Sequence, residues 1–418
     1  MTTTTLDAPP AWTRLLRGSG EWQPRLDLDA HLRNHGALPD SIRSGHVDLL
    51  DALEAVDLRG RGGAAFPLAR KARGVRTATG RALVVGNGSE GEPASRKDAT
   101  LLQRAPHLVL DGLELAAVTV GAPEARLVVG DAAALRSAMA ALAERPRGMP
   151  RVRVEVVAVA DRFVAGESSA VVRASSGRQP IPMFTLKRTG DGGVNGRPTL
   201  VSNVETLAQL AVLARLGVTG YRATGTDAEP GTTLLTVYRG AGAEVIEVPL
   251  GIPLTDVLGD RADTQAVLVG GYHGSWLAPG IAARTIVSRA GMREVGGDLG
   301  AGLVIPLPPS ACPLVEAAPV LGMLASASAR QCGPCVHGLR AIADRMQALA
   351  DGTATGEDLE RLDRWAQILP GRGACAHPDG VVRFVSTLLR SHATEVAVHR
   401  HRSCGRRLRH VLPIGSRS

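Results

Sequence analysis

The sequence is poor in aromatic residues and lysine, and it holds few cysteines. Aromatic residues make up 3% of the 418 residues, and only three residues are lysine: Lys71, Lys97 and Lys187. With so few rings to stack on bases, nucleic-acid binding has little support. Five cysteines in a chain without an apolar signal region argue against a disulfide framework and favour metal or redox use. They are Cys312, Cys332, Cys335, Cys375 and Cys404.

Long apolar runs are also absent. No uninterrupted run approaches the ~18 residues needed to span a bilayer, so we expect a cytoplasmic protein that reaches the inner face of a membrane only through partners. A content of 44% hydrophobic and 21% charged residues is ordinary for a globular chain of several domains. Part of the net charge of +8 lies in residues 399–418, which hold six arginines and no acid. We interpret this segment as a solvated basic tail.

Strands and helices alternate through the first half of the chain. Helical spacing of apolar residues predicts a helix from His46 to Leu58, just before a glycine-rich loop. Further strands are predicted at 82–86, 126–129 and 152–159, and helices near 98–119 and 132–144. This alternation predicts a parallel α/β sheet with helices on both faces. Ligands of such sheets bind beyond the carboxyl ends of strands, where the loop after Val85 and the turn 165–167 would lie.

The pattern changes near Thr232. Short strands are predicted at 233–240, 243–251 and 266–276, with a short helix at 254–259. Beyond Pro308 the chain becomes helical, because apolar residues from Leu339 to Leu349 share one face. Thr355 and Asp358 are spaced like a helix start.

Two loops around the first strand carry the strongest chemical signal. Residues 60–71 read GRGGAAFPLARK, and residues 87–98 read NGSEGEPASRKD. Glycines let backbone N–H groups converge on a phosphate, and Arg61 and Lys71 add positive charge. The second loop carries paired carboxylates at a strand's carboxyl end. A third segment, 196–206, reads GRPTLVSNVET. Together these segments predict a phosphate-bearing cofactor held over carboxylates.

The three segments resemble those of the flavin- and NADH-binding subunit of respiratory complex I and of bacterial diaphorases, which carry GRGGAGF, NADEGEP and GKPT-x-x-NNVET patterns. The resemblance extends from about residue 40 to about residue 402. It implies an N-terminal extension at 1–40, an FMN- and nucleotide-binding α/β domain at 41–228, a β-grasp (SLBB-like) domain at 229–305, a helical iron–sulfur domain at 306–402 and a basic tail at 403–418.

The resemblance also implies site residues. FMN would be held by Gly60, Arg61, Gly62, Gly63, Lys71, Asn87, Glu90, Gly166, Glu167 and Asn203. Glu92 would lie where the nicotinamide approaches, and we take it as the catalytic-site residue. The nucleotide would contact Phe66, Glu92, Ser168 and Arg188. A flavin needs no acid or base for hydride transfer, so the protein's task is positioning and exclusion of water.

The cysteine pair Cys332 and Cys335 precedes a predicted helix, whose positive N-terminus favours metal-bound thiolates. Cys375 lies in a segment resembling the one that bears the family's last cluster ligand, but Ala329 stands where the family has a further cysteine. Three thiolates could hold a [3Fe–4S] cluster, or a [4Fe–4S] cluster with another fourth ligand. The candidates for that ligand are Ser328, His337, Cys312 and Cys404.

A tetrahedral zinc site of Cys332, Cys335, Cys375 and His377 is the alternative for these cysteines. We expect Cys312 and Cys404 to be a core cysteine and a tail thiol rather than ligands.

The sequence departs from the family pattern mainly on the nucleotide side. Gly74 and Arg188 stand where the family has aromatics, and Ser168 replaces the second acid of its GEE turn. Ser89 and Ala65 replace an aspartate and a glycine. An acid that binds the ribose 2′-hydroxyl selects NADH. Its loss, near the basic residues Arg178, Lys187 and Arg188, predicts a weak or reversed preference for NADH over NADPH.

We therefore expect an electron-transfer subunit that oxidises NADH or NADPH through FMN and an iron–sulfur cluster. Its partner would be a ferredoxin-like or other iron–sulfur protein, or a membrane-bound acceptor complex. The alternative is a non-catalytic scaffold or electron conduit with a structural zinc or a vestigial cluster site.

Overall fold

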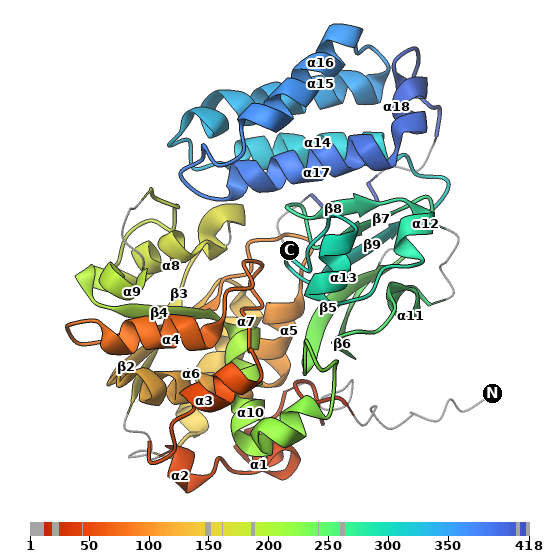
Figure 1. Ribbon diagram of the computed structural model, residues 1–418. Helices are drawn as coiled ribbons and strands as arrows, with labels where there is room; N and C mark the ends of the chain where they lie inside the picture. Colours follow the sequence, from red (N-terminus) through yellow and green to blue (C-terminus); the bar gives the residue numbers. More distant parts are fainter. Residues whose placement is uncertain are drawn as a thin grey trace.

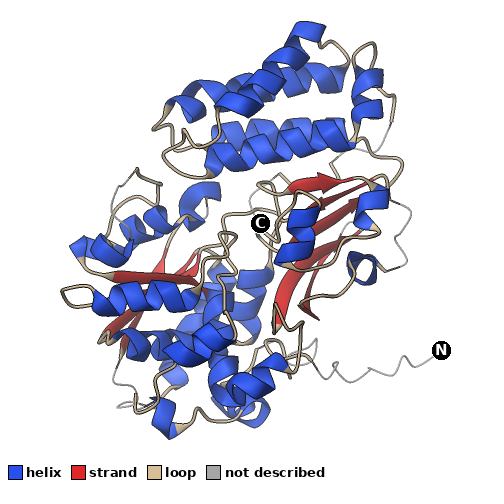
Figure 2. Cartoon of the chain, viewed as in Figure 1, coloured by secondary structure: helices blue, strands red, loops and turns tan. Residues whose placement is uncertain are grey.

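Three structural units follow one another along the chain (Figure 1). The computed structural model describes residues 12–18, 25–43, 45–146, 152–160, 162–184, 189–240, 242–259, 264–406 and 410–414. A parallel sheet with its helices comes first, a mixed sheet second, and a set of packed helices last (Figure 2). Among these residues no helix combines the length and the apolar character that crossing a membrane requires.

The first unit is built on four parallel strands in the order β3-β2-β1-β4. The strands are β1 (Leu83–Gly88), β2 (Glu124–Val129), β3 (Arg153–Ala158) and β4 (Thr199–Asn203). Successive residues of β1 point to opposite faces: Leu83 and Val85 pack with Val171, whereas Val84 joins the core on the other side. Helices cover both faces, which confirms the predicted fold class.

The helices of this unit are α1 (Leu28–His35), α2 (Asp40–Arg43), α3 (Leu50–Ala55), α4 (Leu68–Thr77), α5 (Lys97–Arg104), α6 (Pro106–Val120), α7 (Ala132–Glu144), α8 (Ser168–Ser175), α9 (Thr189–Gly192) and α10 (Val204–Arg222). The single helix predicted near 98–119 is wrong in one respect, because it is two helices, α5 and α6. Pro106 begins α6, where its missing N–H costs nothing. The helix predicted over 46–58 is shorter, since only α3 forms there.

The strand order positions the candidate site. It reverses at β1, whose neighbours are β2 on one side and β4 on the other. Crevices for ligands form at the carboxyl ends of strands at such a reversal. Asn87 of β1 and Asn203 of β4 are register partners there. The predicted acidic loop and the SNVET segment therefore leave the sheet side by side.

The second unit is a mixed sheet in the order β6-β5-β9-β7-β8. Its strands are β5 (Thr232–Arg239), β6 (Gly242–Pro249), β7 (Ala266–Val269), β8 (Ser275–Leu277) and β9 (Leu303–Leu307), with helices α11 (Leu254–Leu258), α12 (Pro279–Ala282) and α13 (Arg289–Glu294). The strands predicted at 233–240 and 243–251 are present, but the single strand predicted at 266–276 is wrong, because the chain turns there into an antiparallel pair, β7 and β8. Gly270 and Gly271, with φ of +84° and +100°, allow the turn. A central β9 that runs parallel to β5 and antiparallel to β7 is compatible with a β-grasp module. The β-grasp assignment itself stays a prediction.

The third unit is helical: α14 (Pro313–Ser326), α15 (Leu339–Asp351), α16 (Gly356–Ile368), α17 (His377–Ser391) and α18 (Ala393–His399). Thr355 and Asp358 form the predicted capping box of α16. The sequence did not predict α17, which packs on β8. The view of residues 399–418 as a solvated tail is also wrong in part. Leu412 is buried, and Glu316 accepts hydrogen bonds from the backbone N–H groups of Val411 and Leu412.

Candidate functional site

The glycine loop is fixed to the start of α10 and to the second sheet. The Arg61 backbone N–H donates to Thr206 Oγ1 at 2.9 Å, and its guanidinium donates to the Thr232 carbonyl at 3.1 Å. Gly63 has φ of +97°, which favours glycine. A Cβ on Gly62 would lie 3.3 Å from Cβ of Asn203. The loop therefore closes tightly over the β4–α10 junction.

Lys71 is a partly buried cation that has no ion pair with any carboxylate in the described part of the chain. Its Nζ donates to the Val201 carbonyl at 3.4 Å, and among the described residues no carboxylate oxygen lies within 4.0 Å of it. Burial lowers the pKa of Lys71. An anionic group beside Nζ would supply the missing charge, and the phosphate of FMN is such a group. The glycine loop and Lys71 thus fit the predicted phosphate end of the cofactor.

The acidic loop is held in place by hydrogen bonds to its own polar side chains. Glu90 accepts from the backbone N–H groups of Asp98 and Ala99 at 3.2 and 3.1 Å, and from the Ser95 hydroxyl at 2.5 Å. Asn87 donates to the Gly166 carbonyl at 2.8 Å. Glu90 therefore caps α5, and Asn87 ties β1 to the turn at 163–166. Their predicted contacts with flavin stay predictions.

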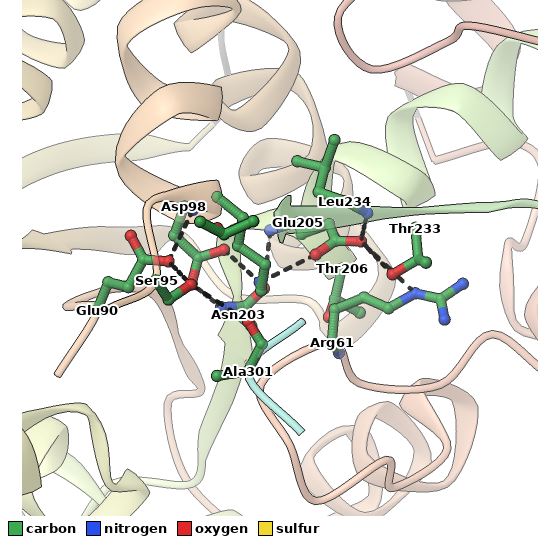
Figure 3. A network of polar contacts seen from close by, with 12 residues as sticks. Arg61, Glu90, Ser95, Asp98, Asn203, Glu205, Thr206, Thr233, Leu234 and Ala301 are labelled. Carbon is green, nitrogen blue, oxygen red and sulfur yellow. Dashed lines mark hydrogen bonds and ion pairs between the residues drawn. The ribbon is translucent and has the colours of Figure 1, made fainter. Parts of the chain in front are cut away.

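A buried network of charged and polar side chains connects the acidic loop with the start of α10 and with β5 (Figure 3). Lys97 Nζ is 2.6 Å from Asp98 and 2.9 Å from Glu205, and all three side chains are buried. Glu205 also accepts from the Leu234 backbone N–H of β5 at 3.0 Å. Asn203 donates to Asp98 at 2.6 Å and caps α10. The network joins the two sheets.

The charges of this network shift one another's pKa. Burial and the nearby charge of Glu90 raise the pKa of Asp98 to about 6, against the attraction of Lys97. Burial alone would lower the pKa of Lys97, but Asp98 and Glu205 raise it above its ordinary value. A cavity of about 20 Å³ lies between the glycine loop and residues 298–302. Its lining includes Arg61, Lys97 and Glu205.

Glu92 is placed between the two sheets rather than at an open surface. Its side chain is buried, and Oε2 accepts from the backbone N–H of Tyr272 at 2.7 Å. Tyr272 lies in the loop between β7 and β8. This contact anchors the second sheet to the acidic loop. The predicted catalytic role of Glu92 stays a prediction.

The turn 163–166 packs directly against the acidic loop. A Cβ on Gly91 would lie 2.1 Å from the Phe163 carbonyl oxygen, and one on Gly166 would lie 2.6 Å from the Ser89 carbonyl oxygen. Only glycine allows this approach at both positions. Glu167 caps α8 by accepting from the backbone N–H of Ser169 at 2.8 Å. The segments predicted to surround the flavin are therefore neighbours.

The residues predicted to contact the nucleotide are mostly exposed, or lie outside the described residues. Phe66 is 39% exposed, and the charged ends of Arg70 and Lys71 lie 5.4 and 5.9 Å from its ring centroid. Ser168 is exposed at the start of α8. Arg188, like Lys187, lies outside the described residues, and Arg178 is exposed beyond the end of α8. Ala65 has φ of +48°, which fits its position in place of a glycine.

The three predicted cluster ligands come together in the helical unit. Cys332 precedes the short helical segment Pro334–Gly338, Cys335 lies within this segment, which continues into α15, and Cys375 precedes α17. Burial, with Cys332 and Cys375 nearby, raises the pKa of the Cys335 thiol to about 12, while Ser328 beside it acts in the opposite direction. Burial therefore disfavours the Cys335 thiolate, which a positively charged metal centre would stabilise.

His377 does not complete a zinc site with these cysteines. Its Nε2 donates to the Leu324 carbonyl at 2.9 Å, so Nδ1 accepts from Nε2 of His273 at 2.8 Å. Both ring nitrogens are therefore engaged. The alternative of a tetrahedral zinc held by Cys332, Cys335, Cys375 and His377 lacks its fourth ligand in this arrangement. The donor set fits an iron–sulfur cluster better.

Models of known protein families match both the α/β unit and the helical unit of this chain. Residues 53–212 match the Nuo51 FMN-binding domain, and residues 316–399 match the NADH-ubiquinone oxidoreductase-F iron-sulfur binding region. The chain is a divergent member of this family of flavin- and NADH-binding proteins. An NADH-quinone oxidoreductase subunit of Rhizobium meliloti (strain 1021) is 26% identical over 375 residues, covering 84% of this chain and 88% of the relative.

Relatives from other sources agree with this membership. The mitochondrial NADH dehydrogenase [ubiquinone] flavoprotein 1 of Dictyostelium discoideum is 25% identical, covering 85% of this chain and 79% of the relative. A chain of an NAD+-reducing [NiFe]-hydrogenase, solved in the air-oxidised state, superposes with a TM-score of 0.79 at 28% identity, covering 92% of this chain and 67% of the hydrogenase chain. This family member therefore spans about two thirds of that hydrogenase chain.

Proposed function

We propose that this chain oxidises NADH or NADPH and passes the electrons to a partner protein, as an FMN- and iron–sulfur-dependent subunit. When bound, FMN would supply the acceptor for hydride and the cluster would supply one-electron transfer. The residues of the chain bind and orient these groups and exclude water. The two family matches support both cofactors in one chain.

The glycine loop and Lys71 support the flavin end of this proposal. Gly62 and Gly63 let the backbone approach a phosphate closely, and Lys71 is a cation that lacks an acidic partner among the described residues. Glu90 and Asn203 hold the flanking helices in place rather than offering unsatisfied groups. We propose that they position the loops, while backbone N–H groups and Lys71 bind the phosphate.

The turn at 163–167 carries the proposal, because it touches both predicted cofactor sites. On one side Gly166 packs on the acidic loop. On the other side the Phe163 ring lies 4.9 Å from the His273 ring and 5.5 Å from the His377 ring, measured between centroids. The charge of Glu167 acts on the Cys375 thiol. A flavin above this turn would therefore be adjacent to the cluster cysteines.

We also propose that the electron acceptor is an iron–sulfur protein, such as a ferredoxin-like subunit, in an assembly at the inner face of a membrane or in the cytoplasm. Relatives named as subunits of NADH-quinone oxidoreductase support a role within a larger assembly.

Anaerobic purification, followed by absorption spectroscopy, iron, zinc and sulfide analysis and titration with NADH and NADPH, tests the proposal. We expect stoichiometric FMN, three or four iron atoms per chain and bleaching of the flavin by at least one nucleotide. Colourless protein that binds zinc at the three cysteines would instead favour the scaffold. A protein that binds FMN but is reduced by neither nucleotide would favour an electron conduit.

A further inference from the structure

Two cysteines outside the matched iron–sulfur region of residues 316–399 meet in a second group of potential metal ligands. Cys312, Glu395, His399 and Cys404 each offer one donor atom, and these four atoms all lie within 4.8 Å of one another. Among the described residues this is the one group of three or more such ligands found at that spacing. Cys312 is the buried core cysteine that we expected, but it and Cys404 also lie beside two further potential ligands, Glu395 and His399.

The distances within the group match the edges of a zinc tetrahedron. Cys312 Sγ lies 3.4 Å from Nε2 of His399 and 3.6 Å from Oε1 of Glu395, and these last two atoms lie 3.6 Å apart. Zinc bonds of about 2.3 Å to sulfur and about 2.0–2.2 Å to nitrogen and oxygen place tetrahedral donors about 3.4–3.8 Å apart.

Hydrogen bonds to backbone carbonyls orient His399 for a metal. Its Nδ1 lies 3.0 and 3.1 Å from the carbonyl oxygens of Leu349 and Ala350, so Nδ1 carries the proton and donates it. In the neutral ring, Nε2 then holds the lone pair, and this is the atom that faces Cys312 and Glu395. An N–H held by a carbonyl is the usual arrangement behind a metal-bound histidine. Both His399 and Cys312 are fully buried.

The local charge also suits a divalent cation. Two thiolates and one carboxylate around Zn²⁺ leave one negative charge in excess. Arg406 lies 3.0 Å from Oε2 of Glu395, the oxygen that does not face Cys312, and offsets that excess. A set of two sulfurs, one nitrogen and one oxygen favours zinc over the harder cations Mg²⁺ and Ca²⁺.

From this geometry we infer that Cys312, Glu395, His399 and Cys404 form a structural zinc site, separate from the predicted iron–sulfur centre. Binding would deprotonate the two thiols and release two protons, with no change in oxidation state. The ion would join the start of α14 to α18 and to the segment after it. Four protein ligands leave no open position, which is typical of a structural site.

Metal analysis of the full chain, expressed with zinc supplied and purified anaerobically, tests the inference. We expect one zinc per chain in addition to the iron. Cys404→Ser removes a ligand that follows the last helix, so the fold should persist, while zinc affinity in a chelator competition should fall at least about tenfold. His399→Asn should have the same effect, and His401→Asn, at an exposed neighbouring position, should not.

Iron analysis of the same variants separates the two centres. Iron content should be unchanged in Cys404→Ser, and Cys332→Ser should lower iron while zinc remains. Zinc absent from the parent protein, zinc lost together with iron in Cys332→Ser, or iron lost in Cys404→Ser would each overturn the inference. A disulfide between Cys312 and Cys404 in the anaerobic protein, visible by mass spectrometry, would overturn it too.

Discussion

At the scale of single residues, the flavin assignment depends most directly on Gly62. We expect Gly62→Val to strip FMN, because a branched side chain would meet Asn203 and occupy the space where backbone must approach phosphate. The measurement is FMN released on denaturation per chain. Gly74→Ala is the matched control: a Cβ there meets nothing within 4 Å, and alanine in α4 should add about 0.5–1 kcal/mol of stability. Equal FMN in Gly62→Val and the parent would contradict the assignment.

Ser168 is the residue expected to weaken NADH selectivity. An acid at this position would bind the ribose 2′-hydroxyl and repel a 2′-phosphate. We expect Ser168→Glu to shift the preference toward NADH by about ten- to a hundredfold, as one charge-assisted contact of about 1.5–3 kcal/mol allows. Because Ser168 is exposed in the first turn of α8, an acid there also suits the helix dipole. Flavin reduction rates with each nucleotide measure the effect.

Ser168→Gln is the control for Ser168→Glu, because it matches the size without the charge. Strong NADH selectivity in the unmodified protein would contradict the prediction.

The sequence patterns predicted which segments meet better than they predicted the hydrogen bonds of individual residues. The three segments were predicted to meet, and Asn87 and Asn203 do lie side by side at the ends of β1 and β4. Their hydrogen bonds could not be predicted, because capping by Glu90 and Asn203 depends on which backbone N–H groups the fold leaves unsatisfied. The ligand group around Cys312 was missed because its members come from three places in the chain.

At the scale of elements, the turn before α15 determines the completeness of the cluster. Cys332 and Cys335 are in place, but Ala329 cannot provide a thiolate. We expect Ala329→Cys to raise iron from about three toward about four per chain and to slow cluster loss in air. Ala327→Cys, a thiol two residues earlier at the end of α14, is the control and should not do so. Unchanged iron content and air stability in Ala329→Cys would show that another group, such as Ser328, already completes the cluster.

Some elements were predictable and others were not. Strand β5 and helix α7 are short segments with a clear pattern of apolar residues. The structure has both at their predicted positions. The break between α5 and α6 was missed because buried residues continue from Leu101 and Leu102 of α5 into α6, although Pro106 marks the boundary. The packing of residues 411–413 was not predicted, because the arginine-rich composition around them is typical of a solvated tail. Their contacts with Glu316 and Tyr272 come from distant segments of the chain.

At the scale of the whole molecule, Glu92 connects the two sheets through Tyr272. We expect Glu92→Ala to cost about 1–3 kcal/mol of stability, because it leaves the buried Tyr272 N–H without this acceptor. Glu92→Gln keeps an acceptor oxygen and should stay near the parent in thermal unfolding. If Glu92 also orients nicotinamide, Glu92→Gln will lose turnover without losing stability. Full activity and stability in both variants would contradict both roles.

Buried and partly buried histidines should make the whole fold sensitive to acid. Burial is the largest cause of a lowered pKa at five of them: His35, His107, His273, His377 and His392. For His35 the pKa falls from 6.5 to about 3, with the charges of His31 and Arg215 adding to the effect. The folded protein keeps these rings neutral, whereas the unfolded chain binds protons below pH 6.5. Their contribution to stability is therefore complete above pH 6.5 and is lost as the pH falls toward 3.

We accordingly expect the melting temperature to decline steadily once the pH drops below about 6.5, with each unit of pKa shift corresponding to about 1.4 kcal/mol. His35→Gln removes one of the titrating rings, and Nε2 of His35 has no hydrogen-bond partner among the described residues, so little is lost at neutral pH. The variant should show a shallower decline than the parent, whereas the exposed control His401→Gln should follow the parent. Thermal melts from pH 8 to pH 4 measure the slopes. Identical slopes in His35→Gln and the parent would show that protonation of His35 is not coupled to unfolding, because linkage requires the slope to change with the number of protons taken up.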